Sequence, residues 1–271
     1  MHGSANYVTA MKKAILTGCI AALGFVLTPA ACRAESFGPG DVLTDAKLYF
    51  TAPLRWDGTD WLYFGGALAA IGAAHEADND VRKHFAVGDR AVLDGQDKYS
   101  IRDAVPAAAV AVGTWAFGEL LDDQAGRVEA YTMLEAAGFS AITTTGLKYA
   151  AGRARPNETT KVDDWRTGGS SFPSLHVSAA FAIGTVLAES GGDDFRWLRR
   201  FAGYGMALGT AYIRVHDNEH WLSDTVAGAA IGIATAHFTM NRRETRAHRW
   251  DVSVEPAEGG GVSMAFRLTL Q

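Results

Sequence analysis

The sequence predicts an all-α body, because six apolar segments rich in alanine and glycine recur along its 271 residues. Gly and Ala lower the propensity for β-strands, and the segments are longer than most strands. Polar connections separate them, and some carry helix-stopping residues such as Arg155-Pro156 and Gly191-Gly192. We therefore expect one helix from each of the segments Trp61–Ala74, Ala104–Gly118, Ala136–Leu147, Val177–Ala188, Phe201–Ile213 and Thr225–Asn241.

The regions that flank these segments differ from them in pattern. Residues 35–59 are mixed and punctuated by Gly and Pro, which predicts a loop with one helical turn around Thr44–Phe50. In residues 250–271, two stretches of alternating apolar residues surround Gly259–Gly261, which predicts a small C-terminal β-hairpin with one apolar face. The chain thus divides into a leader (1–34), a helical domain (35–249) and a β-hairpin tail (250–271).

The first 34 residues have the features of an export signal. A basic start at Met11–Lys13 precedes the uncharged stretch Ala14–Cys32, and a cleavage point follows Ala34. We expect a signal peptide and an exported, periplasmic protein; a membrane anchor that stays uncut is the alternative. Both cysteines, Cys19 and Cys32, lie in this leader, so the predicted mature chain has neither disulfides nor thiolate chemistry.

The apolar segments are short for membrane spans. A span needs about 20 apolar residues, whereas the longest charge-free stretch after the leader, Thr225–Asn241, has 17. If all six segments crossed the membrane, the basic loops near Arg199 and Arg243 would lie outside, against the positive-inside tendency. If Trp61–Ala74 does not cross, the tendency is restored. Two locations stay open: a soluble or peripheral periplasmic domain, and an inner-membrane protein with its site facing the periplasm.

The charge of the chain argues against a nucleic-acid partner. The formal net charge is −5, and removing the predicted leader takes away three basic residues and no acidic one. Nucleic-acid binding requires a basic surface. A local basic cluster can still bind a small anion.

The stretch Ala211–Gly228 contains the first candidate for chemistry. His220 and Asp224 are four residues apart and would share one helical face. The carboxylate can accept a proton from one ring nitrogen and leave the other free to attack. Arg214 offers a planar fork of donors for an oxyanion. Taken alone, the pair also fits a helix cap or a surface contact.

A second candidate lies at the end of the third apolar segment. Lys148 and Arg155 are seven residues apart, which is close to two helical turns, so both cations can share one face. Pro156 then ends the helix. Arg153 either joins the two cations or points to solvent. The alternative is that basic residues here only offset the helix dipole.

The third candidate precedes the fourth apolar segment. With Pro173 in the first turn of a helix, the Ser174 hydroxyl and the N–H groups of Leu175 and His176 would form an anion site. His176 adds a group that gives or takes a proton near neutral pH. A serine cap with an incidental histidine is the alternative.

Together, the three stretches resemble the type 2 phosphatidic acid phosphatase superfamily in order and spacing. That family has Lys, six residues, Arg-Pro; then Pro-Ser-Gly-His; then Ser-Arg, five residues, His, three residues, Asp. The resemblance covers roughly Trp61 to Met240 and implies an all-α bundle with a six-helix core, a fold shared with vanadium-dependent haloperoxidases and class A acid phosphatases. Two positions depart from the pattern: Leu175 replaces glycine and Ile213 replaces serine.

The resemblance implies a metal-independent phosphatase that acts on mono- or diphosphate esters through a phosphohistidine. His220 would attack phosphorus, Asp224 would hold its tautomer, and His176 would protonate the leaving oxygen and then activate water. No cofactor is implied. The phosphate would be bound by Lys148, Arg155, Ser174, Leu175 and Arg214.

The substrate remains open at this level. Leu175 and the apolar helix ends favour a phosphorylated lipid over a soluble phosphoester. The competing functions are a vanadate-dependent haloperoxidase and a non-catalytic module that binds phosphate or lipid. Haloperoxidases are usually much longer, and every acid, base and cation of the family pattern is present, so the phosphatase is favoured.

Overall fold

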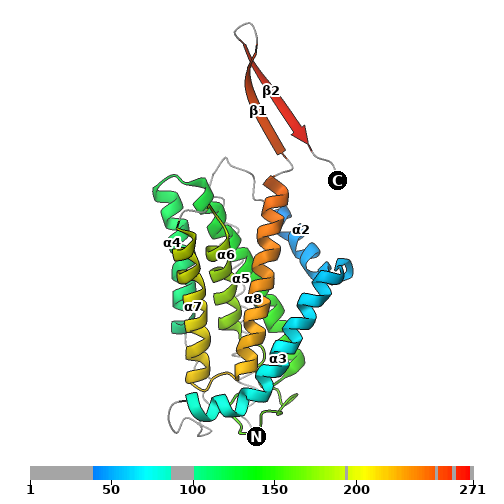
Figure 1. The fold of residues 1–271 in the computed structure, drawn as a ribbon, viewed down its shortest axis with the longest axis vertical. Helices are drawn as coiled ribbons and strands as arrows, with labels where there is room; N and C mark the ends of the chain where they lie inside the picture. Colours follow the sequence, from blue (N-terminus) through cyan, green and yellow to red (C-terminus); the bar gives the residue numbers. More distant parts are fainter. Residues whose placement is uncertain (1–38, 87–100, 193–194, 248–249, 258–260, 269–271) are drawn as a thin grey trace.

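The computed structural model describes residues 39–86, 101–192, 195–247, 250–257 and 261–268, and most of them are helical (Figure 1). Each predicted segment lies in one helix, apart from Ala104 at the end of a 3-10 turn, which confirms the all-α prediction for the body of the chain. The predicted leader, with its cleavage point and both cysteines, lies outside the described residues. The helices are α2 (Pro39–Phe50), α3 (Gly58–Phe85), α4 (Val105–Leu120), α5 (Gln124–Ala151), α6 (Leu175–Glu189), α7 (Arg196–His216) and α8 (Leu222–Ala247), with 3-10 turns η1 (Ala52–Arg55) and η3 (Ile101–Ala104).

Helix α6 forms the centre of the bundle and packs against α5, α7 and α8. Glycines allow the close approach. A Cβ at Gly184 of α6 would lie 2.5 Å from the carbonyl oxygen of Gly203 in α7. A Cβ at Gly228 of α8 would lie 2.6 Å from the carbonyl oxygen of Ser174, just before α6. The absence of a side chain at Gly228 therefore allows the start of α6 to lie directly beside the first turns of α8.

Helix α3 lies against the core rather than in it. The main cluster of buried apolar side chains comes from α4 to α8. The buried side chains of α3 are Ala74 and Asp78, and the helix runs obliquely past the beginning of α8 (Figure 1). A buried carboxylate is therefore the main polar link from α3 to the bundle.

The region before α3 is more ordered than the sequence predicted. A complete helix, α2, replaces the expected loop with a single turn at Thr44–Phe50. The reason is tertiary: buried Asp45 accepts a hydrogen bond from Arg242 of α8 at 2.9 Å, and the ring of Tyr49 stacks on Phe139 of α5. Contacts so distant in sequence leave no local pattern.

Beyond α8, the strands β1 (Trp250–Ala257) and β2 (Gly261–Leu268) pair antiparallel, with Trp250 opposite Leu268 and Ala257 opposite Gly261. Figure 1 draws them past the end of α8.

Among the helices in the described ranges, none combines the length and the hydrophobicity that a membrane crossing requires.

Candidate active site

The predicted site residues converge where four helix ends meet. Lys148 and Arg214 lie in the last turns of α5 and α7, and Asp224 lies in the first turn of α8. The backbone N–H of Ser174, before α6, donates to the carbonyl oxygen of Asp224 at 3.0 Å. All three predicted cations and His176 act electrostatically on His220. The structure therefore gathers the three motifs around one imidazole.

The loop after α5 brings Lys148 and Arg155 together. The helix ends before Gly152, which adopts the left-handed conformation with φ of 55°, so the predicted shared helical face is wrong. Instead, both cations reach Ser170. The Lys148 ammonium donates to its carbonyl oxygen at 2.5 Å, and the Arg155 guanidinium donates to its hydroxyl at 3.3 Å. A folded loop, not helical periodicity, sets the spacing of these charges.

The start of α6 presents an unsatisfied hydroxyl. Helix α6 begins at Leu175 with Ser174 as its N-cap, so Pro173 lies outside the helix rather than in its first turn as predicted. The hydrogen bond from the Ser174 N–H to Asp224 holds Ser174 in an extended conformation. Its Oγ is buried and has no hydrogen-bond partner. A buried orphan hydroxyl beside the free N–H groups of a helix start is suited to an anion.

His220 precedes α8 rather than sharing a helical face with Asp224, because the helix begins only at Leu222. The backbone N–H of His220 donates to the carbonyl oxygen of Arg214 at 3.1 Å. Its Nδ1 lies 3.5 Å from Oδ2 of Asp224. The same oxygen accepts the N–H of Trp221 at 2.9 Å. Asp224 thus caps the helix start and lies beside Nδ1 of the histidine, which has no hydrogen bond within usual geometry.

Burial and positive charge keep both histidines neutral. Burial, followed by the charges of Lys148 and Arg214, lowers the pKa of His220 well below its usual value. Burial, then Arg214, lowers the pKa of His176 to about 4. A neutral imidazole has the lone pair that a nucleophile needs. A bound phosphate would offset the cations and make His176 easier to protonate.

A carboxylate lies between the two arginines of the site. Arg155 and Arg214 are both almost fully buried. Each donates to Oε2 of Glu219, the distance from Arg214 being 3.5 Å, and Arg214 also donates to Asp103 beside α4. Glu219 therefore occupies an acceptor position that a phosphate oxygen would use.

We expect Glu219→Gln to strengthen inhibition by inorganic phosphate about tenfold, because the variant removes a negative charge that competes for both guanidiniums. Steady-state inhibition measures the change. Glu158→Gln is the matched control, since Glu158 accepts a hydrogen bond from the backbone N–H of Arg155 at 2.8 Å. An unchanged inhibition constant in the Glu219 variant would contradict the competition.

Sequence reasoning did not single out Glu219, Asp103 or Asp78, and it left Arg153 undecided. Arg153 is fully buried and donates to Asp224 at 2.7 Å. Asp78 and Asp103 precede the motifs by many residues, so spacing holds no signal for them. Glu219 directly precedes His220, and its position within the third motif was the one available indication.

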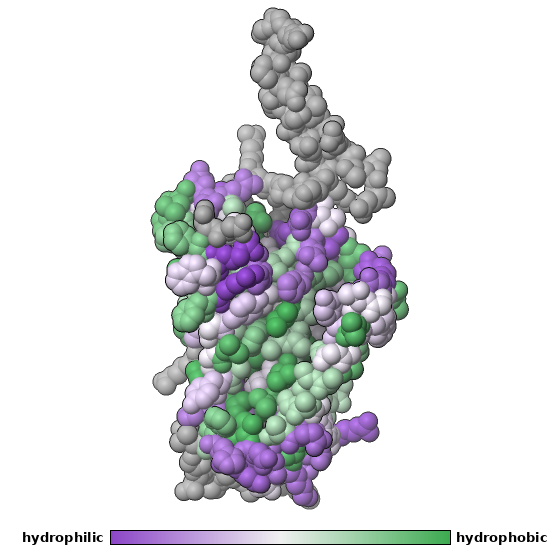
Figure 2. Space-filling model, in the orientation of Figure 1, coloured by the Kyte–Doolittle hydropathy of each residue, from purple (hydrophilic) through white to green (hydrophobic). Residues whose placement is uncertain are grey.

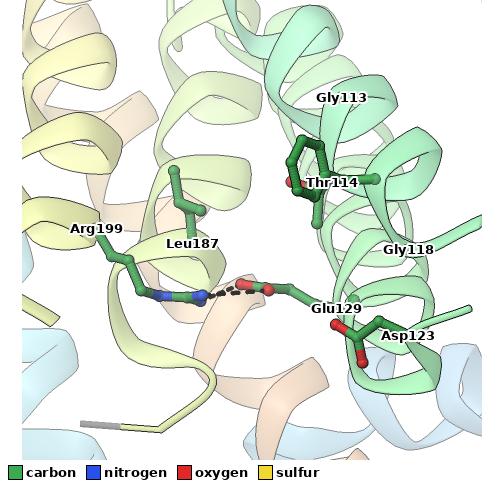
Figure 3. Close-up of a pocket in the computed structure, with 9 residues that line it drawn as sticks. Gly113, Thr114, Gly118, Asp123, Glu129, Leu187 and Arg199 are labelled. Atoms are coloured by element: carbon green, nitrogen blue, oxygen red, sulfur yellow. Dashed lines mark hydrogen bonds and ion pairs between the residues drawn. The ribbon is translucent and has the colours of Figure 1, made fainter. Parts of the chain in front are cut away.

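A separate hollow of about 330 Å³ lies at the opposite ends of the same helices. It is lined by Phe117 of α4, Glu129 of α5 and Arg199 of α7, and the last two form an ion pair (Figure 3). It does not belong to the candidate active site. No group of three or more His, Cys, Asp or Glu side chains in the described part of the chain is arranged to hold a metal ion.

Comparison with known proteins agrees with the motifs. The model of the PAP2 superfamily matches residues 129–247, which include all three motifs. The match covers less than half of the chain. A lipid A 1-phosphatase of Porphyromonas gingivalis is 38% identical over 86 residues, which are 32% of this chain and 17% of that protein. The chain thus spans less than a fifth of that relative's length. The crystal structure of Aquifex aeolicus LpxE is similar over 54% of this chain and 88% of that one, with 19% identity and a TM-score of 0.36.

Two positions of the PAP2 motifs carry unusual residues. Leu175 is the first residue of α6 and half-buried, so its N–H still belongs to the free first turn. Ile213 is 41% exposed on α7. A serine at this exposed position would not make a buried hydrogen bond. The candidate site therefore keeps its donors despite both changes.

Proposed function

We propose that this chain is a phosphatase that hydrolyses lipid-linked phosphate or diphosphate esters through a phosphohistidine at His220. The observation that carries the proposal is a buried imidazole, His220, whose Nδ1 lies 3.5 Å from a buried carboxylate at the helix ends and the loop that bear the three cations. The PAP2 match and the partial likeness to a lipid A 1-phosphatase support the same class of reaction.

The first step forms a bond between Nε2 of His220 and phosphorus as the bond to the leaving oxygen breaks. Asp224 stabilises the positive charge that develops on the ring. His176 takes up a proton when the bound phosphate offsets the nearby cations, and it gives this proton to the leaving oxygen. The equatorial oxygens are held by Lys148, Arg155, Arg214 and the Ser174 hydroxyl.

The second step returns the histidine to its free state. His176, now neutral, takes a proton from water while the water oxygen attacks phosphorus, and the bond to Nε2 breaks. The electron pair of that bond returns to the ring nitrogen. Inorganic phosphate leaves, and His220 is neutral again.

The surface of the helices favours a lipid substrate and contact with a membrane. Hydrophilic residues gather at the two ends of the face shown in Figure 2, and an apolar band lies between them. An extended apolar surface of this kind marks a partner or a lipid phase, and Trp and Tyr suit its boundary. Large exposed apolar side chains on α3, α4 and α7 include Trp61, Leu62, Tyr63, Phe64, Leu68, Val112, Phe117, Leu120, Trp197, Phe201, Leu208 and Tyr212.

Of the two locations left open by the sequence, we favour the peripheral periplasmic domain, with its apolar band (Figure 2) against the membrane. The proposal that the protein is exported to the periplasm rests only on the predicted signal peptide.

A substrate panel tests the function. Purified full-length protein is offered phosphatidate or an isoprenoid diphosphate in mixed micelles and, in parallel, p-nitrophenyl phosphate, and released phosphate is measured. We expect kcat/KM for a lipid phosphate to exceed that for the aryl ester at least about tenfold, because remote apolar contacts contribute binding energy. Preference for the soluble ester would contradict the lipid assignment. Phosphate binding by calorimetry without any turnover would instead indicate a binding module.

A further inference from the structure

A buried polar network outside the predicted site connects α3 to the candidate nucleophile. Its centre is Arg153, whose side chain is inaccessible to solvent. Gly152 turns the chain at the end of α5, and the close contact of Gly169 with the backbone of Arg153 fixes the following residues: a Cβ at Gly169 would lie 2.3 Å from the Arg153 carbonyl oxygen. The fold therefore directs this arginine inward, two residues before the Arg155 of the phosphate site.

All three guanidinium nitrogens of Arg153 donate. One terminal nitrogen donates to Asp224 at 2.7 Å and to the Ser223 hydroxyl at 2.8 Å. The other donates to Asp78 at 2.8 Å, and Nε and this second nitrogen both reach the carbonyl oxygen of Val162. A planar fork can hold two carboxylates in fixed relative positions, which an ammonium cannot do.

Aromatic rings confine the same guanidinium. The ring of Trp165 lies 4.6 Å and that of Trp221 5.2 Å from its central carbon. Such cation–π contacts restrict the plane of the guanidinium and exclude water from it. The direction of its hydrogen bond to Asp224 is therefore set by packing as well as by its partners.

Asp78 is the second half of the network. It is 1% exposed on a helix that buries few other side chains. Its Oδ1 accepts the backbone N–H of Ser223 at 2.8 Å, and its Oδ2 accepts the Ser223 hydroxyl at 2.6 Å as well as Arg153. Asp78 thus fixes the start of α8 and the guanidinium together. His75, one turn earlier on α3, lies 3.2 Å from Asp78.

We propose that Arg153 and Asp78 are positioning residues for the proposed reaction: Asp78 fixes the guanidinium, and the guanidinium keeps Asp224 ionised and aimed at Nδ1 of His220. The inference rests on the proposed function for its kinetic consequences and on geometry alone for the orientation of the ring. Asp224 has no exposure, and its remaining donors are Ser171 and the backbone of Trp221, neither of which carries a charge.

The ionisation of Asp224 depends on this arginine. Burial raises the pKa of Asp224 above its usual value, and Arg153 is the largest influence that opposes this rise. Loss of the guanidinium would thus raise that pKa, and a protonated Asp224 could not accept the Nδ1 proton of His220. An ionised Asp224 fixes the tautomer with the lone pair on Nε2, which is the form needed for attack.

Three variants of the full chain separate charge from geometry. Arg153→Gln removes both, Arg153→Lys keeps the charge without the two-carboxylate fork, and Asp78→Asn leaves the charge but loosens the fork. Arg82→Gln is the matched control, because Arg82 also lies on α3 and approaches the Trp221 ring, at 5.7 Å. Thermal unfolding of each variant identifies any that does not fold, and Asp78→Asn is the mildest change because its amide oxygen can still accept the Ser223 N–H.

The kinetic readout is the pH profile and the split between kcat and KM. We expect kcat to fall about 100-fold in both Arg153 variants and about tenfold in Asp78→Asn, with KM changed less than about threefold, since misplacing a reacting group by a fraction of an ångström has effects of this size. The acidic limb of kcat moves to higher pH in Arg153→Gln and stays in place in Arg153→Lys. A loss of folded protein would lower the apparent kcat at unchanged KM but would leave the acidic limb in place, so the position of the limb separates misplacement from unfolding.

The second readout does not require turnover. In protein with ¹⁵N-labelled histidine at neutral pH, we expect His220 to carry its proton on Nδ1 in the wild type and in Arg82→Gln, and to show a mixture of tautomers in Arg153→Gln and Asp78→Asn. Variants that keep the wild-type tautomer, kcat and pH limb would overturn the proposal. If the wild type hydrolyses no phosphate ester, the proposed function is wrong. The His220 tautomers in the wild type and the variants would still show whether Arg153 and Asp78 position Asp224.

Discussion

Phosphate release stops when His220 is replaced by alanine. The variant lacks the nitrogen that bonds to phosphorus in the proposed reaction, and His176 is already used as the acid and base. We expect kcat to fall by about four orders of magnitude or more. Rapid quench with labelled substrate should trap a phosphoprotein in the wild type and none in the variant.

Binding should survive this change. The predicted phosphate ligands Lys148, Arg155 and Arg214 are untouched, and Nδ1 of His220 has no hydrogen bond within usual geometry whose loss would disturb them. Calorimetry with inorganic phosphate should give a dissociation constant within about threefold of the wild type. His237→Ala, an exposed change on α8, serves as the control. Wild-type turnover, or a labelled phosphoprotein in the His220 variant, would end the proposal.

The helical body was predictable because its information is local. Six apolar segments with polar breaks between them were enough to predict α3 to α8. Helix α2 was missed because Asp45 and Tyr49 are held by Arg242 and Phe139, which are far away in sequence. The same reason explains Asp78: a carboxylate on an exposed helix has no local pattern that marks it as buried.

The sequence predicted which residues form the site better than it predicted how they are arranged. Fixed spacing identified Lys148, Arg155 and His220, but periodicity wrongly placed them on helical faces, because Gly152 ends α5 early and α8 begins after His220. Spacing along the chain survives such differences, since loops as well as helices can deliver a side chain to one point. What it does not report is which buried groups balance the charges that converge there. Glu219 and Arg153 supply that balance and are visible only in three dimensions.

Several hydrogen-bond donors, one of them charged, converge on the buried carboxylate of Asp224. We therefore expect Asp224→Asn to have the second-largest effect on kcat. Three donors converge on this carboxylate, from Arg153, Ser171 and the backbone of Trp221. An amide of the same size must turn its NH₂ group toward at least one of them, or toward His220. An NH₂ facing Nδ1 selects the tautomer with the proton on Nε2, which has no lone pair to attack phosphorus. We expect kcat to fall about 1,000-fold or more with little change in KM.

The same variant tests stability independently of chemistry. Removing the charge leaves Arg153 with Asp78 as its one carboxylate partner, and breaking a buried ion pair costs about 3 kcal/mol or more. Asp224→Asn should therefore unfold at a lower urea concentration than the wild type, and rates must be taken where the protein is fully folded. Asp217→Asn is the matched control, because Asp217 pairs with His216 near the end of α7 and is more accessible to solvent. If folded Asp224→Asn turns over within tenfold of the wild type, Asp224 does not set the tautomer, and its place beside His220 reflects only the cap that it provides to α8.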